Sequence, residues 1–315
     1  MYFEYFKIKE EPFSATPDPR FLYRSPRHQE ALERMTAAVS MRRGVTALVG
    51  EPGLGKSTLI RTMLSDLKEQ IHFAWLFNTT LNSTELLRYI CRDFGLEPRG
   101  EDKGMVLMEL YTFLIDKYKS GINCVLIIDE AQNLSPQVLE EIRLLSNLET
   151  VNNKLLQIVL SGQPELDTHL NAPALVQLKQ RISLKSSLVR LSRDETARYV
   201  LHRLNLAGAA AFDIFTKTGL RAVNRYSDGI PRMINHVCEN AMMLAVERKI
   251  EKIDGDLVDD IIKQGLITPV QPLSRKKPEN QMEIQKENVS IQAIDSEPDS
   301  DKFGFIDINE LITVL

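Results

Sequence analysis

Apolar and polar positions follow two different periods along the first two thirds of the chain. Short apolar, β-prone runs predict strands, and they lie at 45–49, 72–77, 124–128, 155–160 and 187–191. Apolar residues at helical spacing predict helices between them, at 27–41, 57–69, 83–94, 103–119 and 136–150. Strands that alternate with helices indicate an α/β fold, with a parallel sheet covered by helices on both faces.

From residue 194 the pattern changes to helices only. They are predicted at 194–206, 209–218, 219–226, 231–247 and 254–264, and Asp254 is the expected cap of the last one. A small all-α bundle that follows an α/β core suggests a core with a lid.

A glycine-rich motif lies between the first predicted strand and the helix that follows it. Its residues are Gly50, Glu51, Pro52, Gly53, Leu54, Gly55, Lys56, Ser57 and Thr58. They match G-x-x-x-x-G-K-[ST], a loop whose backbone N–H groups cradle phosphate oxygens. We expect Lys56 to reach the β- and γ-phosphates of ATP, Ser57 to ligate Mg²⁺ and Thr58 to contact the α-phosphate. ATP and Mg²⁺ are therefore the predicted cofactors.

An acidic pair, Asp129-Glu130, ends the apolar run 124–128. In open α/β sheets ligands bind at the carboxyl ends of the strands, so this pair is predicted to lie beside the phosphate loop. We expect Asp129 to belong to the Mg²⁺ shell, and Glu130 to orient and polarise the attacking water. The presence of both residues favours hydrolysis over nucleotide storage, although a binding module without turnover remains a weaker alternative.

Three further positions are candidates for contacts to the γ-phosphate. At the end of the strand 155–160, either Ser161 or Gln163 is placed to touch the γ-phosphate or the lytic water. Arg181, just before the last predicted strand, is a candidate finger toward the nucleotide of a neighbouring subunit. Arg232 opens a lid helix and could reach the γ-phosphate. The alternative for each arginine is a surface or salt-bridged side chain, and function is favoured more for Arg232 than for Arg181.

Two other features leave their alternatives open. Phe21 and Tyr23, in the N-terminal segment, lie either against adenine or simply in a hydrophobic contact. Lys217, Arg221 and Arg225 recur every four residues and would form a basic stripe on one continuous helix, suited to a phosphate backbone. Gly219 is expected to interrupt that helix, and a solvated face is the ordinary explanation of such a stripe.

Composition and charge limit the compartment and the kinds of partner that are expected. No run of 18 apolar residues occurs, so no integral membrane segment is predicted, and the N-terminus lacks the pattern of a signal peptide. Three scattered cysteines indicate reduced thiols in a cytoplasmic protein. The net charge is −4, and residues 271–315 account for all of it with nine acidic and five basic residues. The remainder is neutral, which excludes a global basic field but not a local patch.

The C-terminal region has a composition of its own. Residues 268–302 are polar and contain four prolines, which predicts a disordered acidic linker. Residues 303–315 are apolar again. This short motif either docks on a protein partner or folds back on the core of this chain.

Taken together, these residues resemble the AAA+ ATPases of the general secretion pathway protein A (ExeA-type) group, from residue 2 to about residue 267. The resemblance rests on the phosphate loop, the acidic pair and four further stretches: Phe6 to Tyr23, Gly162-Gln163-Pro164-Glu165-Leu166, Gln180-Arg181-Ile182 and Gly229 to Asn235. It implies ATP-dependent homo-oligomers, with Gln163 as the first sensor, Arg181 as the finger and Arg232 as the lid sensor.

The expected domains are an N-terminal segment (1–43), a P-loop AAA+ core (44–193), a helical lid (194–267), the linker (268–302) and the terminal motif (303–315). The resemblance implies a cytoplasmic, Mg²⁺-dependent ATPase that assists a secretion or cell-envelope assembly system. Secretion members of the group typically continue into a transmembrane helix and a periplasmic part, where this chain has its acidic tail. The alternative is an ATP-dependent regulator of Tn7-like transposition that binds double-stranded DNA and recruits transposase.

Overall fold

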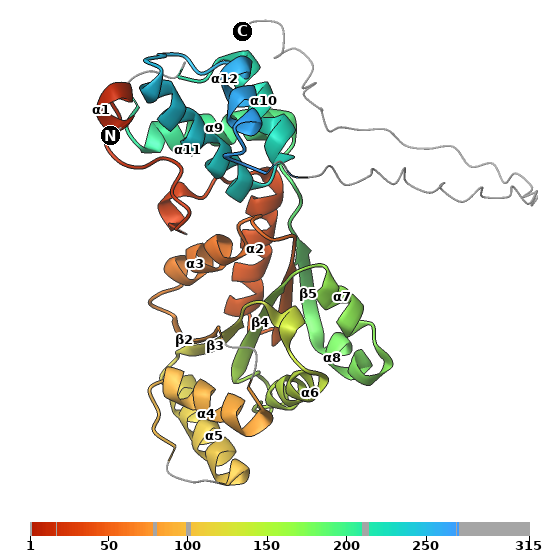
Figure 1. Ribbon diagram of the computed structural model, residues 1–315. Helices are drawn as coiled ribbons and strands as arrows, with labels where there is room; N and C mark the ends of the chain where they lie inside the picture. Colours follow the sequence, from red (N-terminus) through yellow and green to blue (C-terminus); the bar gives the residue numbers. More distant parts are fainter. Residues whose placement is uncertain are drawn as a thin grey trace, which may run out of the picture. The chain divides into compact units, whose positions relative to one another are not determined.

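A five-stranded parallel sheet forms the centre of the protein (Figure 1). The structure, a computed structural model, describes residues 2–16, 18–77, 81–98, 102–209, 214–268 and 270. The strands are β1 (Val45–Val49), β2 (Ile71–Leu76), β3 (Asn123–Ile128), β4 (Leu156–Gly162) and β5 (Ile182–Ser187). Their spatial order is β2-β3-β4-β1-β5, and every neighbouring pair is parallel. The predicted parallel sheet is confirmed, and β4 lies between the phosphate-loop strand β1 and the acidic strand β3.

Helices precede the sheet, alternate with its strands and then follow it. The α-helices of the sheet region are α2 (Pro26–Ser40), α3 (Lys56–Asp66), α4 (Ser83–Asp93), α5 (Lys103–Lys119), α6 (Pro136–Leu145), α7 (Glu165–Leu170) and α8 (Val176–Arg181). Short 3₁₀ turns cover Pro19–Phe21, Ala131–Asn133 and Pro173–Leu175. The α-helices outside the sheet region are α1 (Tyr2–Phe6), α9 (Arg193–Leu206), α10 (Lys217–Ser227), α11 (Pro231–Glu247) and α12 (Gly255–Lys263).

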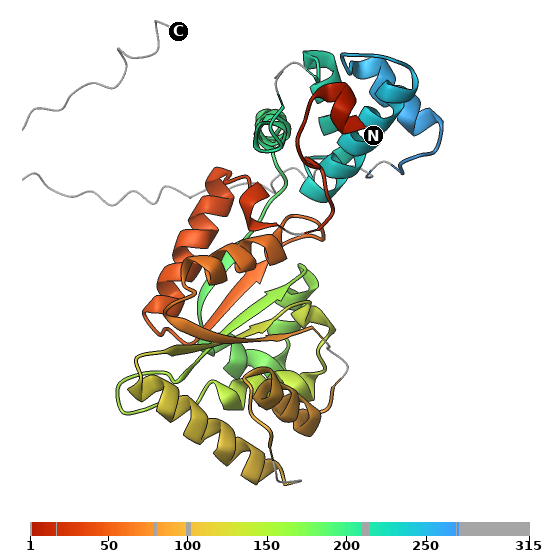
Figure 2. The same ribbon diagram turned by 90° about the vertical axis from the view of Figure 1, so that its left-hand side faces the viewer.

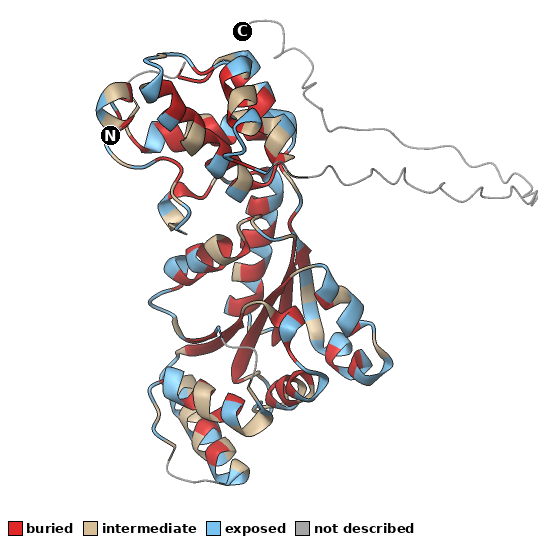
Figure 3. Cartoon of the chain, in the orientation of Figure 1, coloured by how far each residue is buried: buried red, intermediate tan, exposed pale blue. Residues whose placement is uncertain are grey.

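Alternation along the strands produces two hydrophobic cores, one on each face of the sheet (Figures 2 and 3). In β3, Leu126 and Ile128 belong to the core built with α4, α5 and α6, whereas Val125 and Ile127 belong to the core built with α2 and α3. Successive side chains of a strand point to opposite faces, and a parallel sheet must be covered on both. The sheet is therefore covered on both faces, and the carboxyl ends of its parallel strands all lie on the same side.

The last four α-helices form a third hydrophobic cluster together with the start of the chain. Their buried side chains contact Tyr2, Phe6 and Phe13 from the N-terminal segment. The ring of Phe13 meets that of Phe215 edge-on, with centroids 6.3 Å apart. The helical part that follows the sheet thus shares its core with residues that lie about two hundred positions earlier in the sequence, as the pair Phe13–Phe215 shows.

The predicted last strand at 187–191 is wrong, because β5 covers Ile182–Ser187 instead. β5 is an edge strand with alternating exposure, and its residues Ser183 and Lys185 are exposed. An edge strand needs fewer apolar residues than a central one, so the more apolar stretch after it resembled a strand more closely. That stretch, residues 188–191, leads from the sheet to α9.

The helix predicted at 209–218 is wrong, whereas the helix predicted at 219–226 is confirmed, because it lies within α10. Ala209 and Ile214–Thr216 are not helical, and a single helix α10 begins at Lys217, capped by the Thr216 hydroxyl, which accepts from Gly219 N at 3.1 Å. Gly219 lies within the helix, and a glycine is needed there because α10 passes close to the backbone of Ile253. A Cβ on Gly219 would lie 2.3 Å from the carbonyl oxygen of Ile253.

Two further expectations concern the C-terminal region and membrane-spanning segments. The linker lies almost wholly outside the described residues, and the terminal motif 303–315 lies outside them altogether. Among the helices that are described, none has the length and apolar character needed to cross a membrane.

Candidate functional site

The phosphate-binding loop runs from the end of β1 into α3. Gly53 and Gly55 have φ values of 82° and 93°, a left-handed conformation that glycine adopts at little cost. Helix α3 starts at Lys56 with no side-chain cap on its first N–H groups. An uncapped helix start leaves donors and the positive end of the helix dipole for an anion. The loop is therefore built to receive phosphate, as the motif predicts.

Lys56 is buried inside the curve of the loop, with 5% of its surface exposed. Its Nζ donates to the carbonyl oxygens of Gly50 at 2.7 Å and Glu51 at 3.2 Å. Burial lowers the pKa of Lys56, while the negative charges of Glu130 and Asp129 oppose that shift. The ammonium group thus lies within the loop, where it feels the negative charge of both members of the acidic pair.

Asp129 connects the phosphate loop to the strand beside it. Its Oδ2 accepts from the Ser57 hydroxyl at 2.7 Å, and its Oδ1 accepts from the Ser161 hydroxyl at 2.7 Å. Between the two residues left open at the end of β4, Ser161 therefore contacts Asp129, and Gln163 contacts Glu130. The oxygens of Ser57 and Asp129 are hard donors adjacent to the loop, which suits Mg²⁺.

The described residues contain no cluster of three or more His, Cys, Asp or Glu side chains that could enclose a metal on its own. Mg²⁺ in phosphate-transfer sites usually takes only one or two protein ligands and completes its shell with phosphate oxygens and water. Ser57 and Asp129 fit that pattern, and they are the residues that would hold the ion.

Glu130 is held by two side-chain amides. Its Oε2 accepts from Gln132 Nε2 at 2.7 Å and from Gln163 Nε2 at 3.0 Å. Partial burial alone would raise the pKa of Glu130. The two amide bonds and the charges of Lys56 and Arg232 outweigh burial and lower the pKa. Glu130 is therefore ionised at neutral pH and held in position by the two amides.

Gln132 was not predicted to take part in the site. Its Oε1 also accepts from the backbone N–H of Gln163 at 3.0 Å, so it connects Glu130 to the end of β4. The available signal in the sequence was a polar residue two positions after Glu130, and the structure buries it to 9% exposure.

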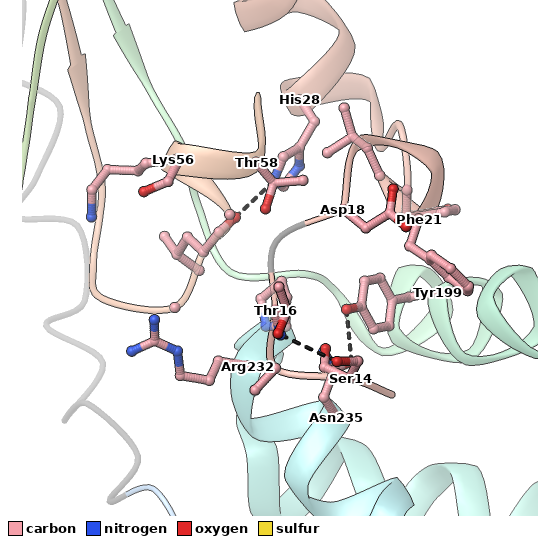
Figure 4. Close-up of a pocket in the computed structure, with 18 of the residues that line it drawn as sticks. Ser14, Thr16, Asp18, Phe21, His28, Lys56, Thr58, Tyr199, Arg232 and Asn235 are labelled. Carbon is pink, nitrogen blue, oxygen red and sulfur yellow. Dashed lines mark hydrogen bonds between the residues drawn. The ribbon is translucent and has the colours of Figure 1, made fainter. Parts of the chain in front are cut away.

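Figure 4 shows the pocket between the loop and the helices that follow the sheet. Phe21 and Tyr23 both line it, and Tyr23 also packs edge-on against Tyr199, so the two interpretations of these aromatic residues are compatible. Arg203, 6% exposed, stacks on Phe21 with its guanidinium 4.9 Å from the ring centroid. His28 closes the side of the pocket, with Nε2 2.9 Å from the carbonyl oxygen of Leu54.

Polar side chains continue this wall of the pocket. The Tyr199 hydroxyl donates to Asn235 Oδ1 and accepts from Arg203, each at 2.8 Å. Asn235 Nδ2 donates to the carbonyl oxygen of Ser14 at 3.4 Å. The predicted site contained none of His28, Tyr199, Arg203 or Asn235, because all four belong to helices distant from the phosphate loop in the sequence.

The two candidate arginines occupy different places. Arg232, in the first turn of α11, lines the pocket, and its positive charge helps to lower the pKa of both Glu130 and Lys56. Arg181 is exposed at the end of α8, directly before β5. The strands are parallel, so the start of β5 lies at the sheet edge opposite the phosphate loop. Arg181 does not line the pocket of its own chain.

Comparison with known proteins places this site in a family. Residues 39–170 match the AAA domain family. Over 260 residues the chain is 42% identical to general secretion pathway protein A of Aeromonas hydrophila, and the match covers 82% of this chain and 47% of that protein. The chain is an AAA+ protein related to general secretion pathway protein A. It spans about half the length of that relative.

Solved structures support the fold of this AAA+ protein. ORC2 of Aeropyrum pernix, in its ADPNP–ADP complexes, aligns with a TM-score of 0.62 at 17% identity, over 84% of this chain and 73% of that one. Cdc6p of Pyrobaculum aerophilum aligns with a TM-score of 0.61 at 18% identity, over 77% and 67%. At these identities the likeness concerns the fold alone. The predicted AAA+ fold and the resemblance to the ExeA-type group are confirmed.

Proposed function

We propose that this AAA+ protein binds ATP with Mg²⁺, hydrolyses it and changes its state of self-assembly as it does so. The single observation that supports the proposal best is Glu130, an ionised carboxylate fixed by two amides next to the Lys56 loop. A nucleotide store would need the loop but not a carboxylate held in this way. The arrangement favours activation of water for attack on a phosphoryl group.

Each side chain has a separate role in the proposed reaction. Lys56 and the loop N–H groups bind the phosphates, and Thr58 lies in the first turn of α3 beside them. Mg²⁺, held by Ser57 and Asp129, would neutralise charge on the phosphates. Glu130 accepts the proton of the attacking water, while Gln163 keeps its carboxylate oriented. Arg232 stabilises negative charge on the γ-phosphate from the lid.

Two substitutions test this proposal. Glu130→Gln keeps the shape of the side chain but removes the base, so it should retain ATP binding, lower turnover by about 10²-fold or more and accumulate the ATP-bound oligomer. Lys56→Ala should lose ATP binding itself. Turnover, ATP affinity and particle size by light scattering are the measurements.

Residues of the same types that do not line the pocket provide the controls. Lys68→Ala, just beyond α3, and Glu140→Gln, in a surface ion pair with Arg143, should leave turnover and size unchanged. If Glu130→Gln hydrolyses ATP at the wild-type rate, the assignment of Glu130 as the base is wrong.

For the biological role we propose assistance to a secretion or cell-envelope assembly system. The support is the 42% identity to general secretion pathway protein A, whose name states that pathway. ATP-dependent self-assembly would give such a system a component whose interactions change with each hydrolytic cycle. A protein partner, bound through residues 303–315, belongs to the same proposal.

One observation favours a second candidate, a regulator of Tn7-like transposition that binds double-stranded DNA. Because α10 is continuous, Lys217 and Arg221 lie one helical turn apart on it, although Arg225 is paired with Asp259. Turnover and particle size with and without DNA discriminate between the candidates. Stimulation and filament-sized particles that disappear steeply with added salt would favour the second candidate. Indifference to DNA would favour the first.

A further inference from the structure

Arg190 connects a carboxylate of the phosphate loop to a carboxylate at the end of α10. It lies in the stretch between β5 and α9. Its Nε is 3.0 Å from each carboxylate oxygen of Glu51, and its Nη2 also donates to Glu51. Its Nη1 donates to Asp228. Glu51 is the second residue of the phosphate loop, and Asp228 ends α10. We call Glu51, Arg190 and Asp228 the ionic junction.

The ionic junction is only partly exposed to solvent. The side chains of Arg190, Glu51 and Asp228 are 18%, 30% and 39% exposed. Hydrogen bonding to Glu51 is the largest cause of a raised pKa for Arg190. A guanidinium presents its donors in a rigid planar fork, so one arginine can address two carboxylates in a fixed geometry, which a lysine ammonium cannot do.

Backbone contacts continue from the ionic junction to Arg232. Leu191 N donates to the carbonyl oxygen of Gly229 at 2.9 Å, and Arg232 N donates to that of Gly53 at 3.2 Å. Gly229 has a φ of 74°, and a Cβ there would lie 2.0 Å from the carbonyl oxygen of Leu191. The five residues 228–232 are therefore tied to the β5–α9 connection at one end and to the phosphate loop at the other.

We propose that Arg190 is a positioning residue for the ATP site, and that it acts by fixing Arg232 relative to the phosphate loop. The inference rests on the proposed function, because Arg232 is taken there to contact the γ-phosphate. Arg190 itself does not line the pocket. Its effect on nucleotide must therefore pass through the ionic junction and the start of α11.

A binding experiment tests the inference without using hydrolysis. The measured quantity is the ratio of the Kd for ADP to the Kd for a non-hydrolysable ATP analogue, which reports contacts to the γ-phosphate. Arg232→Ala should lower this ratio by about tenfold, as for one lost hydrogen bond to a charged group. Arg190→Ala should lower it by about threefold or more. Arg190→Lys should fail to restore it.

The double variant separates positioning from general damage. If Arg190 acts through Arg232, then Arg190→Ala in the Arg232→Ala background should change the ratio, and kcat, by less than about twofold. Asp228→Asn should reproduce part of the Arg190→Ala effect without altering the backbone, because asparagine tolerates the left-handed φ of 47° found there. Melting temperatures are recorded for every variant.

Arg193→Ala is the matched control. Arg193 is exposed three residues further on and forms no ion pair within the described part of the chain, so its removal should leave the ratio unchanged. The inference is overturned if Arg190→Ala leaves the ratio unchanged, if its effect multiplies fully with that of Arg232→Ala, or if Arg232→Ala has no effect. Absence of turnover in the wild type would instead contradict the proposed function, while the Kd ratios would still decide the inference.

Discussion

Glu130 is the residue at which the site departs furthest from ordinary backbone geometry. Its φ and ψ are 51° and 39°, a left-handed conformation that a glutamate rarely adopts. Its backbone N–H donates to Asp129 Oδ1 at 3.0 Å, which ties the turn to the neighbouring carboxylate. Such strain persists only where surrounding contacts over-determine it. Here Gln132 and Gln163 supply those contacts, and they hold the carboxylate of Glu130 in one position.

Removing one amide from Glu130 should move the pH dependence of turnover. The amide bonds stabilise the ionised form and lower its pKa, so Gln132→Leu should raise that pKa. In the proposed reaction the ionised form is the active one, so turnover should then be lost at a higher pH as the solution is acidified. The acidic limb of kcat/KM should therefore move to higher pH in Gln132→Leu.

The pH profile of kcat/KM between pH 4.5 and 8 measures this shift. Gln137→Leu is the control, because Gln137 is exposed on α6 and does not contact Glu130. An acidic limb that stays in place in Gln132→Leu would mean that Gln132 serves only the turn after β3.

At the scale of elements, α10 differs from its prediction: Gly219 was expected to interrupt the helix, but the helix continues through it. Gly219 sits inside the helix because the helix approaches the backbone of Ile253, which bridges to Phe215. Gly219→Ala would improve helix propensity, yet it would place a Cβ 2.3 Å from a carbonyl oxygen. We expect the steric term to prevail and to destabilise the protein by about 2 kcal/mol.

The thermal midpoint should therefore fall by about 4–8 °C in Gly219→Ala. Gly255→Ala is the matched control at the same seam between α10 and α12. Its Cβ would meet nothing closer than 3.4 Å, and its φ is not in the left-handed region, so the midpoint should stay within about a degree. Equal midpoints for both variants would show that α10 moves aside at little cost.

Features set by nearby residues could be predicted from the sequence, whereas features set by neighbours distant along the chain could not. Lys56, Ser57 and the acidic pair were predictable because each stands at a fixed offset from a buried strand, and strand ends converge in a parallel sheet. Gly219 and β5 were misjudged because a close approach and an edge position depend on neighbours. Arg190 was missed for the same reason, since its partner Glu51 lies 139 residues away.

At the scale of the whole molecule, the positions of Arg232 and Arg181 lead to different predictions about assembly. Arg232 lines the pocket of its own chain, whereas Arg181 is exposed at the opposite edge of the sheet. If Arg181 contributes to hydrolysis, it must therefore act on the nucleotide of another copy. A finger of this kind is worth about 10³–10⁵ in kcat, so Arg181→Ala should be nearly inactive by itself.

Mixing inactive variants tests that arrangement directly. Lys56→Ala lacks a working pocket but retains Arg181, and Arg181→Ala retains the pocket. In equimolar mixed oligomers about a quarter of the interfaces pair an intact pocket with an intact finger, so about a quarter of wild-type turnover should return. Arg232→Ala mixed with Lys56→Ala should not recover, because Arg232 belongs to the pocket that it serves. Recovery in neither mixture would remove Arg181 from the reaction, and equal recovery in both would place Arg232 at the interface as well.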